Sequence, residues 1–266
     1  MKAALRQLVP RPLRRALRRL VRAPIYRGDH AGWAEARRAA RGYADPAIAE
    51  KVIAAARAVR DGRAAWERDT VLFHEPAANA PLLRALRHAA AANGGRLRVA
   101  DFGGALGSTW WQHRPWLADL AEVSWAVIEQ PALVAAGRRE FTAGPLRFFP
   151  SLDECAAAAP ADVLLLSSVL PYLENPRALL AAALARPFRH VVVDRTGFVA
   201  RGRDRLTVQH VPPAIYDASY PCWFFDRASL FAGFSPGWRI VEEWACDDEA
   251  DIAAEHRGVH FERIAP

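Results

Sequence analysis

Residues 97–107 read Leu-Arg-Val-Ala-Asp-Phe-Gly-Gly-Ala-Leu-Gly. A short apolar run ends at Asp101 and is followed at once by a loop of small residues that begins at Gly103. Parallel strands of open α/β sheets end in this way where they meet a nucleotide-like ligand, because small residues let the backbone approach the ligand closely. The segment therefore predicts a buried strand, a ligand-binding loop and an α/β fold.

The spacing of the small residues favours one ligand class over another. A dinucleotide fingerprint needs G-x-G-x-x-G, but from Gly103 onward the chain offers alanine and serine at the other two positions. The pattern Asp101-x-Gly103-x-Ala105-x-Gly107 resembles instead the acid-x-Gly-x-Gly-x-Gly signature of class I S-adenosylmethionine (SAM) methyltransferases. The resemblance implies that SAM is the cofactor, with Asp101 near its amino group and Gly104 in the loop beside its methionine part. A strand-to-helix turn without a ligand is the other interpretation.

The net charge of +7 is concentrated in the first 22 residues, which carry eight basic side chains and no acidic one. The other 28 basic residues are balanced by 29 acidic ones, so the high pI describes the tail, and we expect no nucleic-acid partner for the body. Apolar residues in this segment recur at spacings of three and four, interrupted by Pro10 and Pro12, as in a basic amphipathic helix. Residues 1–24 are thus a tail that either lies on an anionic membrane surface through residues 1–22 or packs on its own domain or a partner subunit.

Location follows from what the sequence lacks. No apolar run approaches the ~20 residues of a membrane span, and the N-terminus lacks the features of a secretory signal. Cys155, Cys222 and Cys246 are far apart and form no C-x-x-C pair. We expect a cytoplasmic protein, with peripheral contact to the inner face of the membrane if the tail binds lipid. The histidines show no metal-ligand spacing, so no metal is expected.

From residue 97 onward, strand-like segments alternate with helical ones, which predicts a mostly parallel, doubly wound sheet covered on both faces. Strands are expected at 97–102, 124–129, 146–149, within 162–173, at 191–194, 238–244 and 259–264, the last two as an antiparallel pair. This order resembles the Rossmann-like arrangement of class I methyltransferases, and the resemblance implies that residues 96–266 form the SAM-binding domain. A helical region at 25–95 precedes it, with helices at 33–40, 46–59 and 81–92, and another is expected at 110–121 with an early kink at Pro115. The charged segment 65–73 is either a solvated turn or a lid over the ligand site.

Polar residues follow several of these strands, at the edge where such sheets bind ligands. Glu129 falls 22 residues after Gly107, close to the ~20-residue offset of the acid that binds ribose hydroxyls in dinucleotide folds; an ordinary exposed strand end is the alternative. The resemblance implies that the turn after the third strand meets the adenine and that the loop after the fourth borders cofactor and acceptor. In that turn Asp153 could equally cap a helix at 154–158. The other residues expected to bind the cofactor are Gln130, Ser151, Leu152, Ser167 and Ser168.

Residues 199–225 form a long aromatic and proline-rich insertion, where we expect acceptor recognition. His210 is the first choice for a general base because its ordinary pKa suits proton transfer near neutral pH, and Asp194 and Tyr216 are alternatives. Tyr220 and Trp223 offer aromatic faces for a sugar ring. A loop that only covers the sheet or forms a dimer contact, with His210 in a structural hydrogen bond, is the other interpretation.

Several segments together resemble one bacterial family of SAM-dependent methyltransferases, whose members tend to be encoded among genes for surface polysaccharides. The resemblance spans roughly residues 33–245 and includes G-Y-x-D-P at 42–46, E-R-D-T-V-L-F at 67–73, D-F-G-G-x-L-G at 101–107, E-Q-P at 129–131, S-S-V-L-x-Y-L at 167–173, D-R-T-x-F at 194–198, L-T-V-Q-x-V-P-P-x-I-Y at 206–216 and S-Y-P-x-W at 219–223.

This resemblance implies methylation of an oxygen or nitrogen of a sugar or other cell-surface polysaccharide precursor, a small-molecule or glycan acceptor. An inactive SAM-binding partner subunit of a polysaccharide-synthesis enzyme remains the alternative, because Ala105 replaces a glycine and no clear catalytic signature is present. An NAD-dependent sugar enzyme is disfavoured by the glycine spacing and by the missing Tyr-x-x-x-Lys pair.

Overall fold

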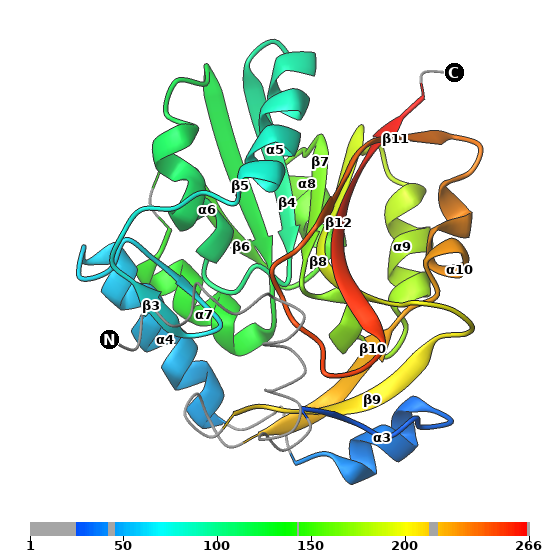
Figure 1. Cartoon of the computed structure of the whole chain (residues 1–266). Helices are drawn as coiled ribbons and strands as arrows, with labels where there is room; N and C mark the ends of the chain where they lie inside the picture. The colour runs from blue at the N-terminus through cyan, green and yellow to red at the C-terminus, as the bar shows by residue number, and fades with distance from the viewer. Residues whose placement is uncertain (1–24, 42–45, 143, 213–217, 265–266) are drawn as a thin grey trace, which may run out of the picture.

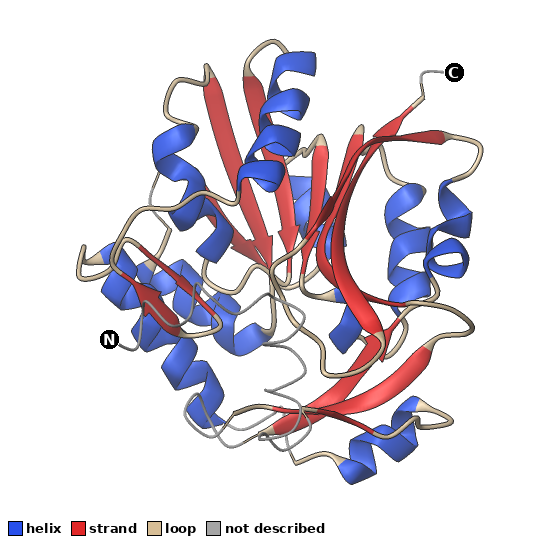
Figure 2. Ribbon diagram, in the orientation of Figure 1, coloured by secondary structure: helices blue, strands red, loops and turns tan. Residues whose placement is uncertain are grey.

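The computed structural model describes residues 25–41, 46–142, 144–212 and 218–264. At its centre lies a seven-stranded sheet in the order β11-β12-β8-β7-β4-β5-β6 (Figures 1 and 2). The five strands from β8 to β6 are parallel, and β12 and β11 run antiparallel to their neighbours. This confirms the predicted mostly parallel sheet. The strands are β4 (Arg96–Phe102), β5 (Glu122–Ile128), β6 (Leu146–Phe149), β7 (Val163–Ser167), β8 (His190–Val199), β11 (Trp238–Ala245) and β12 (Ala254–Arg263).

Helices cover both faces of the sheet, which explains why β7 is apolar at successive positions. Val163 and Leu165 enter one core, with α4 (Pro46–Arg60), α5 (Ala80–Ala92), α6 (Ser108–His113) and α7 (Pro131–Glu140). Leu164 and Leu166 enter the other, with α8 (Leu152–Ala158), α9 (Pro176–Leu184) and α10 (Arg227–Phe231). Because burial of one such side chain stabilises by ~1.5–3 kcal/mol, a run that is apolar on both faces belongs at the centre of the sheet.

Two elements differ from the expected ranges. β8 continues to Val199 instead of ending at residue 194, because β12 begins at Ala254 and pairs with this extension. The helix expected at 110–121 ends at His113 and is followed by a 3₁₀ turn, η1 (Arg114–Trp116). Proline in that turn cannot donate the backbone hydrogen bond that would continue the α-helix, so Pro115 ends the helix rather than kinking it.

The predicted 199–225 insertion forms regular strands. β9 (Arg205–His210) pairs with β1 (Tyr26–Arg27) on one side and β10 (Ser219–Phe224) on the other, in a small antiparallel sheet. In Figure 1 this sheet lies below the carboxyl ends of the central strands, and α3 (Trp33–Ala39) covers its outer face. A 3₁₀ turn after β7, η2 (Leu170–Tyr172), lies against the inner face. The insertion is therefore a second layer beside the ligand-binding edge.

The helices expected at 33–40, 46–59 and 81–92 are present as α3, α4 and α5. Between α4 and α5 the charged segment forms a hairpin, β2 (Trp66–Arg68) and β3 (Val71–Phe73). Trp66 stacks on Phe73, with 3.9 Å between their ring centroids, which fixes the hairpin's register. α5 contributes Leu82 and Leu86 to the first core, so the N-terminal region and the sheet share one core.

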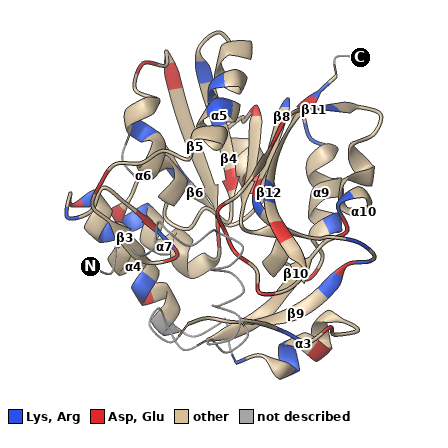
Figure 3. Cartoon of the chain, in the orientation of Figure 1, with Lys and Arg blue, Asp and Glu red and all other residues tan. Residues whose placement is uncertain are grey.

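Basic and acidic residues are interspersed along the elements drawn in Figure 3. Within the described ranges, no helix is both long enough and apolar enough to cross a bilayer. The basic tail at 1–24, with its predicted helix and membrane contact, lies outside the described residues.

Candidate functional site

Unusual backbone conformations gather at the carboxyl edge of the central sheet. Among the described residues, five that are not glycine have a positive φ: Asp69, Thr70, Ala105, Ser168 and Arg195. They lie in the turn of the β2–β3 hairpin, in the glycine loop after β4, at the exit of β7 and within β8. Each such residue costs of order 1–3 kcal/mol, and residues of this kind cluster at functional sites. The edge of the sheet is therefore the candidate site.

The glycine loop is held close to the strand ends by contacts that exclude a side chain. A Cβ on Gly103, whose φ is +75°, would lie 2.5 Å from Val169 in the loop after β7. A Cβ on Gly104 would lie 2.4 Å from the carboxyl group of Asp101. Gly107, with φ +87°, precedes α6 and packs against Leu146 of β6. The loop thus bridges the exits of several parallel strands.

Asp101 lies beneath this loop and is 1 % exposed. Its Oδ2 accepts a hydrogen bond of 2.9 Å from the Trp125 indole on the neighbouring strand β5. Burial raises the pKa of Asp101 to about 7, because the charged form loses its hydration. The acid of the motif therefore lies directly beneath the loop, and near neutral pH its carboxyl group is only partly ionised.

Glu129 is brought directly against the glycine loop. Its Oε1 accepts from the Ala105 backbone amide at 3.2 Å, and its Oε2 accepts from the Gln130 amide at 2.7 Å. Burial raises the pKa of Glu129 as well. The prediction that Glu129 and the loop belong to one site is consistent with this contact, whereas an ordinary exposed strand end would not make it.

In the turn after β6, the residue that caps the next helix is Ser151 and not Asp153. Ser151 caps α8, since its Oγ accepts from the Glu154 amide at 3.2 Å. Leu152 is buried in the second core. Asp153 is exposed and paired with Arg186, so the interpretation of Asp153 as the helix cap is wrong. Its predicted contact with adenine stays a prediction.

Asp194 is the centre of a buried hydrogen-bond network. Its Oδ2 accepts from Asn79 Nδ2 and from Ser167 Oγ, each at 3.2 Å. Its Oδ1 accepts from Trp244 Nε1 at 2.9 Å and from the Cys246 thiol at 3.6 Å. Burial raises the pKa of the Asp194 carboxyl group. With both oxygens engaged and no exposed surface, Asp194 holds four segments together; its predicted role as a base remains untested.

The network continues through Asn79, which caps α5. The Asn79 backbone amide donates to His113 Nε2 at 3.0 Å, and His113 Nδ1 lies 2.8 Å from the Thr109 carbonyl. Nδ1 must then carry the ring proton, so His113 is neutral, and burial lowers its pKa accordingly. The start of α5 and the whole of α6 are thereby fixed relative to Asp194.

A bulge in β8 turns Arg195 toward the β2–β3 hairpin. Asp194 and Arg195 lie opposite the single residue Gly258 on β12, as the register shift shows. Gly258 leaves room for the ring of Trp244, which a Cβ would meet at 2.0 Å. Arg195 Nη2 donates to Asp248 Oδ1 at 2.8 Å and to Asp69 Oδ2 at 3.0 Å. The bulge therefore ties the tip of the hairpin to the sheet.

The hairpin also contacts the glycine loop's helix. Glu67 is 7 % exposed and accepts from the Ser108 hydroxyl at the start of α6 and from the Thr70 amide at 3.1 Å. Glu67 is therefore not part of a solvated turn, although Asp69 at the tip is 60% exposed, and the lid interpretation of 65–73 stays a prediction. The hairpin lies against both the loop and the β8 bulge.

The structure does not bring His210 together with the glycine loop. On β9, Leu206 and Val208 pack on Ala36 of α3, and His210 continues this outer face because side chains alternate along a strand. The inner face carries Gln209, whose Oε1 accepts from the Tyr172 hydroxyl at 2.8 Å. His210 thus lies on the face of β9 that α3 covers, and its predicted role as the base stays a prediction.

The other aromatic candidates of the insertion serve packing. Tyr220 is 9 % exposed and lies edge-on to Tyr172, while Trp223 stacks near Trp33 and donates to the Leu173 carbonyl at 3.1 Å. Tyr216 lies outside the described residues. Sequence reasoning missed Asn79, His113 and Trp244, and for these no short motif existed, because each acts through a partner far away in the chain.

The strand order runs β6-β5-β4-β7-β8-β12-β11, with a glycine loop after β4, an acid after β5 and an antiparallel pair at the far end. The chain has the class I methyltransferase fold. No protein-family model matches it, and no curated protein sequence matches it significantly.

Solved structures with bound SAM or S-adenosylhomocysteine (SAH) are similar to it at low identity. The N-terminal domain of EvdMO1 with SAH is 19% identical over 79% of this chain and 95% of that chain, with a TM-score of 0.47. Magnesium protoporphyrin IX methyltransferase from Synechocystis PCC 6803 with SAM is 14% identical over 81% and 97%, at 0.45. The 1,6-didemethyltoxoflavin-N1-methyltransferase of Burkholderia thailandensis is 16% identical over 91% and 95%, at 0.40.

Proposed function

We propose that this protein is a SAM-dependent methyltransferase that methylates an oxygen or nitrogen of a sugar or another cell-surface polysaccharide precursor. The observation that carries the cofactor assignment is the contact between the Glu129 carboxylate and the Ala105 amide at the carboxyl ends of β4 and β5. The sugar-like acceptor rests on the resemblance of the segments at 194–223 to the polysaccharide-associated family.

The residues at this edge fit SAM by the chemistry of their donor set. Glu129 has two carboxylate oxygens, and each can accept a hydrogen bond from one ribose hydroxyl. When SAM binds, these bonds would replace those from the Ala105 and Gln130 backbone amides. Asp101 lies under the loop where a cationic amino group would favour its ionised form. Leu152 and Asp153 stand at the turn expected to meet the adenine.

SAM supplies an already activated methyl group, so the protein's part is to align the acceptor and to exclude water. The β2–β3 hairpin does the second task, because Glu67 and Asp69 fasten it to Ser108 and Arg195 on two sides of the site. Ser167 and Ser168 border the acceptor side, held by Asp194 through its carboxylate and its carbonyl. The proposed catalysis rests on these residues, which align the acceptor with the methyl group of SAM, and it does not require proton removal by His210.

Calorimetry with SAM, SAH and NAD tests the cofactor assignment. We expect SAM and SAH to bind and NAD not to bind. Glu129→Ala should weaken SAH binding by ~1–3 kcal/mol, the range for hydrogen bonds to a charged group. The matched control is Glu122→Ala, which removes an exposed carboxylate from the opposite end of the same strand and should leave the affinity unchanged. Binding of NAD without SAH, or equal effects of the two variants, would overturn the assignment.

The reaction is tested by following SAH release with nucleotide-linked sugars and with cell-envelope extracts as acceptors. We expect turnover with a hydroxylated or amino-substituted sugar and its loss in Glu129→Ala at limiting SAM. Tight SAH binding without turnover on any acceptor would instead favour the inactive partner subunit. The hydrogen bonds that both Asp194 oxygens accept would then serve the structure and not catalysis.

A further inference from the structure

Three potential metal ligands meet away from the cofactor edge. His88 comes from α5, His190 is the first residue of β8, and Glu262 lies near the end of β12. Each offers one ligand atom, and these atoms all lie within 4.8 Å of one another. His88 Nε2 is 3.7 Å from Glu262 Oε2. A tetrahedral zinc site, with bonds near 2.0–2.1 Å, needs ligand atoms roughly 3.4 Å apart. The three side chains are therefore close to the required spacing.

We propose that His88, His190 and Glu262 form a binding site for one divalent transition-metal ion, with Zn²⁺ as the best match. Two imidazole nitrogens and one carboxylate oxygen are a borderline-soft donor set that zinc prefers over calcium or magnesium. Three protein ligands leave the fourth tetrahedral position to water. The site is independent of the proposed methyl transfer.

His260 orients one of the ligands. His190 Nδ1 lies 3.1 Å from His260 Nε2, and both rings are buried. When His190 Nδ1 carries the proton and donates it to His260, the other nitrogen of His190 keeps a free lone pair for a metal ion. The buried Nδ1 of His260 has no hydrogen-bond partner. Such an unsatisfied buried atom needs an explanation, and a role for His260 in orienting His190 supplies one. His260 is thus a positioning residue for His190.

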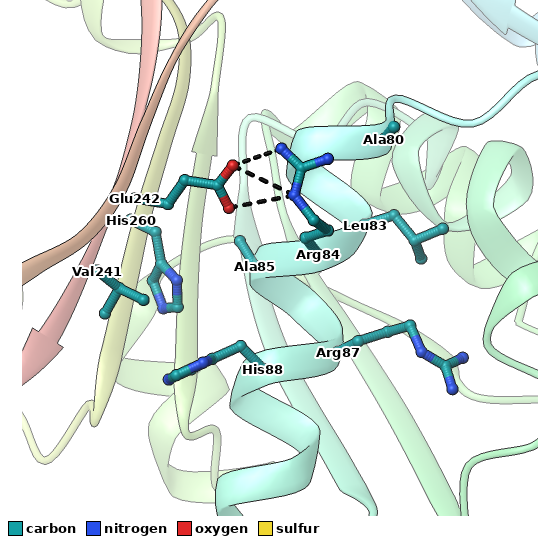
Figure 4. Close-up of a pocket in the computed structure, with 9 residues that line it drawn as sticks. All are labelled: Ala80, Leu83, Arg84, Ala85, Arg87, His88, Val241, Glu242 and His260. Atoms are coloured by element: carbon teal, nitrogen blue, oxygen red, sulfur yellow. Dashed lines mark hydrogen bonds and ion pairs between the residues drawn. The ribbon is translucent and has the colours of Figure 1, made fainter.

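One of the three ligands, His88, borders an open pocket. A pocket of about 800 Å³ opens between α5 and the β11–β12 pair, lined by His88 and His260 among others (Figure 4). His88 is 40% exposed and free to make the short side-chain movement that coordination needs. Glu262 pairs with Arg239, whose side chain is 61% exposed, and giving up such a surface pair costs at most ~1 kcal/mol.

The site lies at the opposite edge of the sheet from the cofactor loop. His190 precedes Asp194 by four residues along β8, a separation of about 13 Å at ~3.3 Å per residue. A bound ion would join α5 to β8 and β12, next to the ion pair between Arg84 and Glu242 that already links α5 to β11 (Figure 4). Its expected effect is therefore to stabilise the fold.

Metal titration of the tag-free, full-length protein tests the proposal. We expect one equivalent of Zn²⁺ to bind and to raise the melting temperature, and one equivalent of Co²⁺ to give the visible absorption of a tetrahedral site. His88→Ala and Glu262→Gln should each weaken Zn²⁺ binding by at least about 10-fold. The matched control is His74→Ala, which removes an exposed imidazole elsewhere.

His88 is partly exposed, so its variant should fold, and unchanged SAH binding by His88→Ala would verify this independently of the metal. Absence of stoichiometric binding to the wild-type protein overturns the proposal. So does a result in which His74→Ala weakens binding as much as His88→Ala, since ions would then bind to scattered surface histidines.

Discussion

Two buried aspartates at the carboxyl edge of the sheet differ in the number of hydrogen-bond donors around them. Asp194 accepts from four donors on three segments, and these hydrogen bonds partly offset the rise in its pKa that burial causes. Asp101 accepts from Trp125 and lies near another carboxylate, Glu129, which together with burial raises its pKa to about 7. Ionisation of Asp101 is therefore unfavourable, and a cationic group bound beside it would favour the ionised form.

The raised pKa of Asp101 predicts a pH dependence of stability that the Asp101→Asn variant isolates from those of Asp194 and Glu129. Between the ordinary pKa of about 4 and the folded value of about 7, Asp101 is protonated in the folded protein and ionised in the unfolded chain. The free energy of unfolding should then fall as pH rises through this window, by at most ~1.4 kcal/mol per pH unit, and level off above pH 7. Urea unfolding of the wild type and of Asp101→Asn from pH 4.5 to 8 measures it, because the variant lacks this slope.

Asp119→Asn is the control for the same series. Arg87 holds the pKa of the exposed Asp119 down to about 2, so its contribution changes only at lower pH. The stability difference between this variant and the wild type should be flat from pH 5 to 8. If the difference for Asp101→Asn is equally flat, Asp101 is ionised throughout and the assignment fails.

At the scale of elements, α5 links the N-terminal region to the site. Its cap residue Asn79 accepts from the Leu82 amide and donates to Asp194, while its backbone amide bonds to His113. The start of this helix is thereby fastened to β8 and α6. Loss of one side chain removes a helix cap and leaves an oxygen of a buried carboxylate with one donor fewer.

Asn79→Ala should therefore lower the free energy of unfolding by ~1–3 kcal/mol, from the lost cap and the lost bond to Asp194. Asn175→Ala is the matched control, because Asn175 also precedes a helix, α9, but its side chain makes no cap hydrogen bond. That change should cost less than ~0.5 kcal/mol. Equal losses for the two variants in urea unfolding would show that the Asp194 network adds no stability.

The elements that sequence patterns predicted are those with local signals. Apolar runs and glycine spacing located β4, β5 and β7, and the offset from Gly107 located Glu129. The bulge at Asp194–Arg195 had no such signal, since it depends on pairing with Gly258, more than sixty residues later. The outward face of His210 was equally hidden, because β9 pairs with β1, whose Tyr26 lies opposite Gln209. Long-range strand pairing decides which side chains enter the site.

At the scale of the whole molecule, charge is divided very unevenly. The first 22 residues carry eight basic side chains and no acid, whereas the remaining chain holds 28 basic and 29 acidic residues. The described part mixes both signs over its elements (Figure 3). An anionic surface would therefore attract the tail and not the body.

We expect the full-length protein to co-sediment with vesicles that contain anionic lipid and not with neutral ones. Each arginine near such a surface contributes ~1 kcal/mol, so raised salt should weaken the binding strongly. Removal of residues 1–22 should abolish it and leave SAH affinity unchanged. Replacing Arg14, Arg15, Arg18 and Arg19 by lysine should preserve binding, and replacing them by glutamine should not. Vesicle binding that survives truncation removes the membrane hypothesis, and a lower melting temperature of the truncated protein would instead place the tail on its own domain.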